Sequence, residues 1–231
     1  MARYGARETY PCDSKPPRSR PNWLLRDGSS LDWGNDHHVN APGAFPLVVH
    51  TLSPLRTTIK VVDDWVDHRF AALRGRKPLD LLFYVASEVA DFSVLWHFLN
   101  ATLLLPNTAK RRAGIRLAAA LGLESILVNG VIKRIFRRER PALESDRAYE
   151  VRRPKTASFP SGHASSATLA ASLLTASFPR WKTLWRILAA IVAASRVHNR
   201  MHHASDVAAG FAVGAVFAAA IKKLWSVGDR H

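Results

Sequence analysis

Five apolar, alanine-rich stretches in the C-terminal two thirds of the chain constrain its fold more than any other feature. Segments such as LAAALGL and AAGFAVGAVFAAAI favour helix over strand, because alanine has the highest helix propensity. No alternation of apolar and polar residues competes with this pattern. We therefore predict an all-α fold, a helical bundle of about five core helices, at roughly 79–105, 113–135, 161–178, 183–199 and 206–224.

Segment length and loop charge bear on whether this bundle spans a membrane. Two of the stretches are long enough to cross a bilayer and the others are marginal, so a globular protein with buried alanine-rich helices is the alternative. Basic clusters at 110–112, 180–186 and 222–223 would share one side, the cytoplasmic one by the positive-inside rule. We predict a multi-pass protein of the cell membrane, with the loops 136–160 and 199–205 on its non-cytoplasmic face.

The first third of the chain has a different character. Residues 1–43 are rich in Pro, Gly, Ser, Arg and Asp and predict a flexible basic and polar arm, without the apolar core of a signal peptide. Residues 44–77 predict an amphipathic helix, which lies either in the membrane interface or on a soluble surface. The main helical domain is predicted at 78–225. The expected apolar face of the amphipathic helix is Val62, Val66, Phe70 and Leu73, opposite Asp63, Asp67 and Arg74.

The charge of the chain points to an anionic partner. The formal net charge of +15 suits nucleic acid, a phosphate-bearing substrate or an anionic lipid surface. No recognisable nucleic-acid-binding module accompanies this charge, so nucleic acid is not the predicted partner, although a non-enzymatic basic binding protein is one alternative. The single cysteine, Cys12, excludes an intrachain disulfide and a cysteine-based metal site.

Two cations in the segment KRIFRRERP form a candidate anion site. Lys133 and Arg140 are seven residues apart, so on a continuous helix they share a face and could reach one anion. The arginine offers a planar fork for two phosphate oxygens, and the lysine acts as a point charge. Three further arginines of the segment are interpreted as interfacial charges, namely Arg134, Arg137 and Arg138.

A second candidate cluster, Pro160-Ser161-Gly162-His163, precedes an apolar helical stretch. Ser161 is suited to cap the helix, and Gly162 lets the backbone approach a ligand closely. The free N–H groups of a helix N-terminus bind phosphate oxygens. His163 would lie beside that anion, where a histidine suits general acid catalysis near neutral pH.

A third cluster contains Ser195-Arg196, then His202 and Asp206. His202 and Asp206 are four residues apart, on one face of a helix, so the carboxylate can fix the tautomer of the imidazole and leave its other nitrogen free to attack phosphorus. An N-cap role for Asp206 is the competing interpretation. Arg196 adds a third cation. No acidic cluster resembles a Mg²⁺ or Zn²⁺ site, so no metal or other cofactor is predicted.

Taken in order, Lys-x6-Arg-Pro, Pro-Ser-Gly-His and Ser-Arg-x5-His-x3-Asp resemble the three-part signature of the phosphatidic-acid phosphatase type 2 (PAP2) superfamily. The resemblance implies that 78–225 is a catalytic domain. It also implies a metal-independent phosphatase that hydrolyses a lipid phosphate or diphosphate, phosphatidate-like or polyprenyl, through a phosphohistidine. The implied partners are therefore a phosphorylated lipid and the membrane. A soluble acid phosphatase or a vanadate-dependent haloperoxidase-like enzyme is the alternative within the same resemblance.

The resemblance also implies a role for each residue of the signature. His202 attacks phosphorus, Asp206 orients it, and His163 protonates the leaving alkoxide and then activates water. The groups that would hold the phosphoryl oxygens are Lys133, Arg140, Arg196, Ser161 and the amide of Gly162. A cage of cations of this kind stabilises the charge that develops during phosphoryl transfer.

Overall fold

The computed structural model of the chain describes residues 46–143 and 149–228, and in this part every regular element is helical. The predicted all-α class is thereby confirmed, and the predicted arm 1–43 lies outside the described residues. The principal helices are α1 (Pro46–Ala71), α2 (Lys77–Val89), α3 (Val94–Leu103), α4 (Arg111–Ser125), α6 (Gly162–Ser177), α7 (Lys182–His198) and α8 (Ala204–Gly228). The shorter elements are η2 (Asp91–Ser93), η3 (Ile126–Ile132), α5 (Lys133–Ile135) and η4 (Pro179–Trp181).

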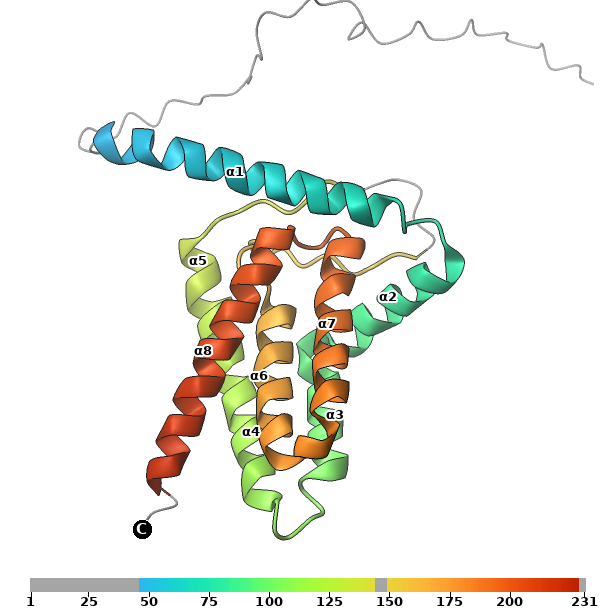
Figure 1. The fold of residues 1–231 in the computed structure, drawn as a ribbon, viewed down its shortest axis with the longest axis vertical. Helices are drawn as coiled ribbons and strands as arrows, with labels where there is room; N and C mark the ends of the chain where they lie inside the picture. Colours follow the sequence, from blue (N-terminus) through green and yellow to red (C-terminus); the bar gives the residue numbers. More distant parts are fainter. Residues whose placement is uncertain (1–45, 144–148, 229–231) are drawn as a thin grey trace, which may run out of the picture. The chain divides into compact units, whose positions relative to one another are not determined.

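The central helix of the bundle is α6, which packs against α7, α8 and α4 (Figure 1). Its side chains are mostly alanine, serine and leucine, and nearly all of its middle turns are buried. Two glycines bring α8 into backbone contact with it: a Cβ on Gly210 would collide with the carbonyl oxygen of Ser161, and one on Gly214 with that of Ser165. Small residues four apart allow this close approach between helices. The start of α8 is therefore held directly against the start of α6.

The first predicted core helix, 79–105, is broken in the structure, so its prediction as one helix was wrong. α2 ends at Val89, and the chain passes through η2 before α3 begins. Phe92 and Ser93 have backbone φ angles of 51° and 59°, which residues other than glycine rarely adopt. Beyond this turn Trp96 is fully buried in the main core. The break directs Asp91 toward the end of the bundle where α6 begins, as described below.

The second predicted core helix, 113–135, is continuous but changes its winding. α4 runs into η3, a π-helical segment, and then into the single turn of α5. A π segment rotates the residues that follow it relative to a regular α-helix, and such segments are frequent at functional sites. Lys133 comes directly after it and is buried.

The N-terminal helix α1 lies across one end of the bundle and contacts α7 and α8 (Figure 1). Val66 and Phe70 pack on the bundle as predicted, against a small core of Ala164, Ala193 and Val197. The rest of the predicted polarity is wrong at three positions. Asp63 is 4% exposed and Val62 is 50% exposed, and Arg74, just after the helix, donates to the carbonyls of Val197 and His198 in α7. The side of α1 that faces the bundle therefore meets polar groups as well as apolar ones.

Two helical segments are long and apolar enough to cross a membrane, Arg111–Ile135 and Ala204–Leu224. Only 28% and 33% of their most apolar windows are buried in the bundle, so most of their apolar surface faces outward. Val216 of α8 and Ile126 of η3 are both about two-thirds exposed, at 68% and 67%. A helix in the core of a soluble protein would bury these side chains, and a membrane-spanning helix exposes them to lipid.

Candidate active site

The three sequence clusters meet at one end of the bundle. The start of α6, the end of α7, the start of α8 and the loop after α5 all lie at this end (Figure 1). The terminal nitrogen Nη1 of Arg140 lies 3.3 Å from Nε2 of His202. Nδ1 of His202 lies 3.8 Å from Oδ2 of Asp206. Segments that are up to 73 residues apart in sequence, from Lys133 to Asp206, thus form one site.

His202 lies in a turn rather than on a helix with Asp206, so the predicted shared helical face is wrong. α7 ends at His198, and α8 begins only at Ala204. The turn is closed by two backbone N–H groups, those of Met201 and His202, which donate to the carbonyl of Arg196 at 2.9 and 3.1 Å. Arg200 adopts a positive φ of 51° within it. The turn still brings the two side chains together, but through a loop.

Asp206 is fully buried and accepts hydrogen bonds from three groups. Ser158 Oγ donates to Oδ2 at 2.5 Å, the backbone N–H of His203 donates to Oδ2 at 2.9 Å, and Arg138 Nη1 donates to Oδ1 at 2.7 Å. The bond from His203, three residues earlier, is the one made by the acidic residue of a capping box. Asp206 therefore caps α8 and also faces the imidazole of His202, so the two interpretations left open by the sequence both hold in part.

Ser158 is a site residue that the sequence reasoning missed. Its hydroxyl lies 3.4 Å from Nδ1 of His202 as well as 2.5 Å from Asp206. It therefore sits between the carboxylate and the ring nitrogen, and can link the two. Its only sign in the sequence is its position, two residues before the Pro160–His163 motif.

Arg138 is a second missed residue, and its interpretation as an interfacial charge was wrong. One terminal nitrogen donates to Asp206, and the other donates to Oδ2 of Asp63 at 2.6 Å. Asp63 also accepts from the backbone N–H and from the hydroxyl of Ser205, both at 2.8 Å. α1 is thereby joined to the carboxylate that faces His202. No sequence signal connects Asp63 with this site, because 143 positions separate it from Asp206.

His163 lies in the first turn of α6 as predicted, and Ser161 caps that helix by accepting from the backbone N–H of Ala164 at 3.4 Å. Nε2 of His163 lies 2.9 Å from Oδ1 of Asp91, at ion-pair distance, although the two are not aligned as a hydrogen bond. Asp91 comes from the break between α2 and α3 and was not foreseen. Each histidine of the site therefore has its own carboxylate.

The predicted phosphate-binding cations converge on the site from separate elements. Lys133 is 9% exposed and Arg196 is 1% exposed. Nζ of Lys133 lies near Gly162, 3.8 Å from where a Cβ of that residue would be. Arg196 Nη1 donates to the hydroxyl of Ser87, while its Nε makes no hydrogen bond within the described part of the chain. A buried guanidinium with an unused N–H is suited to bind an anion.

Arg140 reaches the site from a loop, so the predicted continuous helix from Lys133 to Arg140 is wrong. The helix ends at Ile135, and Phe136 is extended, with φ −100° and ψ 92°. The guanidinium is held by backbone carbonyls, with Nη1 donating to Met201 at 2.7 Å and Nε to Thr156 at 3.1 Å. Burial, followed by the charge of Arg153, lowers the pKa of Arg140.

The environment of His202 keeps its imidazole neutral. Burial lowers the pKa of His202 to about 3; the contact with Asp206 opposes this shift, and the charges of Arg196 and Arg140 add to it. A neutral ring has one nitrogen with a free lone pair. Nδ1 faces Ser158 and Asp206, and Nε2 faces the guanidinium of Arg140, which can only donate. The geometry therefore favours a proton on Nδ1 and a lone pair on Nε2.

Two further polar residues near the end of α7 have structural partners. His198 Nε2 binds Asp80 at 2.8 Å, and Arg200 binds Asp67 at 2.8 Å. Within residues 46–143 and 149–228, no three side chains of the His, Cys, Asp and Glu types converge as a metal ion would need.

Comparison with known proteins agrees with the class that this fold and site define. The PAP2 superfamily matches residues 113–227, and the chain belongs to that superfamily. This confirms the family predicted from the three motifs.

One relative and one solved structure illustrate the range of the superfamily. Over 107 residues the chain is 40% identical to the decaprenylphosphoryl-5-phosphoribose phosphatase of Mycolicibacterium smegmatis. The match covers 45% of this chain and 57% of that protein, so the chain spans little more than half the length of this relative. The fold is similar to the crystal structure of a transmembrane PAP2-type phosphatidylglycerolphosphate phosphatase from Bacillus subtilis. The TM-score is 0.53 and the identity 16%, over 78% of this chain and 91% of the other.

Proposed function

We propose that this protein is a lipid phosphatase that transfers a phosphoryl group to Nε2 of His202 and then to water. The observation that carries the proposal is the pairing of a neutral, buried imidazole with three cations. His202 is 2% exposed, and its Nε2 faces Arg140, with Lys133 and Arg196 close enough to lower its pKa. A nucleophile that stays unprotonated beside cations suits attack on an anionic phosphate ester.

The proposed reaction has two steps. In the first, the lone pair of His202 Nε2 forms a bond to phosphorus while the bond from phosphorus to the leaving oxygen breaks, and the imidazolium form of His163 gives a proton to that oxygen and becomes neutral. In the second, water attacks the phosphohistidine while His163 takes a proton from it, and the P–N bond breaks to release inorganic phosphate. Asp206 stabilises the positive ring of His202 in both steps. Asp91 is positioned to do the same for His163.

The cations hold the phosphoryl oxygens during both steps. Lys133, Arg140 and Arg196 converge from α5, a loop and α7, and the N-terminus of α6 adds the backbone N–H of Gly162 and the end of its dipole. Arg140 contacts Nε2 of His202 in this structure, so its guanidinium has to move toward the phosphoryl oxygens when substrate binds. This set of charges supplies the electrostatic stabilisation that phosphoryl transfer requires.

The proposed substrate is a phosphorylated lipid, phosphatidate-like or polyprenyl. The relative from Mycolicibacterium smegmatis is described as a phosphatase of a decaprenyl-linked phosphoribose, which favours the polyprenyl class. The outward-facing apolar surface of Arg111–Ile135 and Ala204–Leu224 suits an enzyme that meets its substrate in a membrane.

We further propose that the chain is a multi-pass protein of the cell membrane with its site on the non-cytoplasmic face. Lys110 donates to the carbonyl of Ser177 at 2.8 Å, so the basic loops at the ends of α3 and α6 lie together, at the end of the bundle away from the site. The positive-inside rule makes that end cytoplasmic. α1, which lies across the other end, would then rest in the membrane interface.

Phosphate release from lipid phosphates in detergent micelles, with EDTA present, tests the proposed function. We expect turnover by the wild type, a loss of roughly a thousandfold or more in His202→Ala, and an acid-labile phosphoenzyme that this variant does not form. The neighbouring, partly exposed His203 provides the matched control, and His203→Ala should retain turnover. Activity that depends on added Mg²⁺, or that survives in His202→Ala, would contradict the mechanism. Halide oxidation in the presence of vanadate and peroxide, without phosphatase activity, would favour the haloperoxidase-like alternative.

A further inference from the structure

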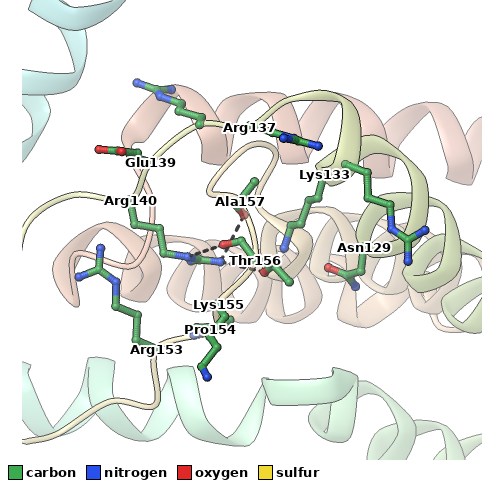
Figure 2. Close-up of a pocket in the computed structure, with 12 residues that line it drawn as sticks. Asn129, Lys133, Arg137, Glu139, Arg140, Arg153, Pro154, Lys155, Thr156 and Ala157 are labelled. Atoms are coloured by element: carbon green, nitrogen blue, oxygen red, sulfur yellow. Dashed lines mark hydrogen bonds between the residues drawn. The ribbon is translucent and has the colours of Figure 1, made fainter. Parts of the chain in front are cut away.

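A large basic pocket opens beside the phosphate-binding cations. It has a volume of about 770 Å³ and is formed by η3, α5 with the loop that follows it, and the loop before α6. Seven of its twelve lining residues are lysine or arginine, and Glu139 is its one acidic residue. Figure 2 shows the side chain of Arg140 reaching Thr156 and Ala157, with Lys133 on one side and Arg153 on the other. The pocket therefore continues outward from the reaction site.

The charges of this pocket exceed what the proposed reaction uses. Lys133 and Arg140 belong to the phosphoryl cage, and Arg138 is neutralised by Asp63 and Asp206. Four cations remain, and within the described residues none of them lies at ion-pair distance from a carboxylate. They are Arg134, Arg137, Arg153 and Lys155.

The cations that line this pocket repel one another in the absence of an anion. Arg140 and Arg153 both line it, and the charge of Arg153 adds to the effect of burial in lowering the pKa of Arg140. Arg153 donates to the backbone carbonyl of Pro141 at 3.0 Å, an interaction that orients it but does not neutralise it. Like charges gathered in one concavity raise the local concentration of anions and strengthen their binding.

The size of the pocket also exceeds one phosphoryl group. Pockets of about 300–1,000 Å³ usually enclose a whole small molecule, and 770 Å³ falls in that range. Ile135 and Phe136, which lie in the chain between Arg134 and Arg137, are 67% and 51% exposed. An amphiphile could thus place a polar, charged part in the pocket and its apolar chain beside these residues.

We propose that this pocket binds a second phosphate group of the substrate, one that is retained on the product. The inference rests on the proposed function, because the first phosphate is the one that His202 attacks. The substrate class is then an amphiphile with a terminal phosphate monoester and a second phosphate between that group and the lipid. The second phosphate is either a phosphodiester bridge to a sugar or the inner phosphate of a diphosphate. Arg153 and Lys155 carry the recognition, and Arg134 of α5 and Arg137 of the loop after it support it.

Three substrates with the same prenyl chain test this proposal: a prenyl monophosphate, a prenyl diphosphate and a prenylphosphoryl pentose 5-phosphate. Each is presented in neutral detergent micelles with EDTA, and kcat/KM for phosphate release is measured. We expect the wild type to prefer at least one of the two doubly phosphorylated substrates over the monophosphate. In the double variant Arg153→Gln, Lys155→Gln, that preference should fall at least about tenfold, the effect expected from loss of charge-assisted hydrogen bonds.

Arg152→Gln is the matched control. Arg152 has the same charge and lies in the same loop, but it packs over the ring of Phe92 and does not line the pocket. This variant should keep the wild-type preference. Which of the two doubly phosphorylated substrates loses more in the double variant identifies whether the pocket takes a diester or a diphosphate.

Two outcomes overturn the second-phosphate site and leave the phosphatase proposal intact. One is a wild type that turns over the monophosphate as well as the others. The other is a double variant that loses the same factor on all three substrates, as expected if these cations only attract the enzyme to an anionic surface. Failure of the wild type to release phosphate from any of them, or equal rates in His202→Ala, would instead refute the proposed function itself.

Discussion

Asp63 of α1 and Asp206 of α8 are held by the two terminal nitrogens of one guanidinium, that of Arg138, at 2.6 and 2.7 Å. The two carboxylates are almost completely buried, at 4% and 0% exposed. A single guanidinium between two carboxylates joins them through charge-assisted hydrogen bonds and fixes their separation. The N-terminal helix, which lies outside the three motifs, therefore contributes to the setting of the carboxylate that faces His202.

Substitution Asp63→Asn tests this coupling. It removes one charge from the network, leaves Arg138 less firmly held and lets Asp206 shift relative to His202. We expect kcat to fall roughly tenfold, with a smaller change in KM, because the substituted side chain is not in the phosphate cage. Asp64 is the matched control, since it is 66% exposed and, among the described residues, its ion pair is with the equally exposed Lys60. Equal activity in Asp63→Asn and Asp64→Asn would rule out the coupling.

Substitution Ser158→Ala removes the hydroxyl that lies between Asp206 and His202. Asp206 then loses a short hydrogen bond, and Nδ1 of His202 loses its nearest polar neighbour. The expected result is a fall in kcat of roughly tenfold and slower formation of the phosphoenzyme in rapid-quench measurements. Ser177→Ala, at the far end of α6, removes only a hydroxyl that donates to the carbonyl of Leu173. Turnover at the wild-type rate in Ser158→Ala would show that Asp206 positions the ring without help.

The neutral state of His202 makes folding sensitive to acid. Its pKa is about 3 in the folded protein and about 6.5 when unfolded, so below pH 6.5 the unfolded chain binds a proton that the folded chain does not. The contribution of His202 to the free energy of unfolding is therefore fully present above about pH 6.5 and is lost as the pH drops toward 3. Between pH 8 and pH 5 the loss from this one group is about 2 kcal/mol.

Thermal melting of the wild type and of His202→Asn in detergent measures this effect. The wild type should lose several degrees more of Tm than the variant between pH 8 and pH 5, since asparagine does not titrate. Other groups that titrate in this range contribute equally to both proteins and cancel in the difference. An equal fall in Tm for the two proteins between pH 8 and pH 5 would mean that His202 is not held neutral by burial.

Close contact between α6 and α8 makes Gly214 sensitive to substitution. A methyl group there would collide with the carbonyl oxygen of Ser165 and push α8 away from α6. We expect Gly214→Ala to destabilise the protein by about 1–3 kcal/mol and to lower activity, because Asp206 is carried on the first turn of α8. In contrast, a Cβ on Gly122 of α4 would meet nothing within 4 Å. Gly122→Ala should leave Tm unchanged or raise it, since alanine favours helix over glycine.

The part of the site that the sequence predicted is the part carried by short motifs. His163, His202 and Asp206, and the cations Lys133, Arg140 and Arg196, all lie at the end of the bundle where the three motifs were expected to meet. Helix location was also predictable, because alanine-rich apolar stretches have few other ways to fold. The predicted core helix at 161–178 corresponds to α6, Gly162–Ser177, within one residue at each end.

The errors concern how those residues are joined. The sequence placed Lys133 with Arg140, and His202 with Asp206, on single helices, since spacings of seven and four suit a helical face. In the structure a loop intervenes in each pair, because Phe136 is extended and α7 ends at His198. Spacing along the chain cannot distinguish a continuous helix from a turn that brings the same side chains together.

By itself the sequence determined the helical class and the family and supplied the candidate site residues of the three motifs, because helix propensity and motif spacing depend on neighbouring residues. Only the tertiary structure decided which further groups support them: Asp63 behind Arg138, Asp91 beside His163, and Ser158 between His202 and Asp206. Each of these contacts joins elements that are distant in sequence. It depends on the packing of α1, the break after α2 and the path of the loop before α6, which arise only when the whole bundle buries its apolar surface.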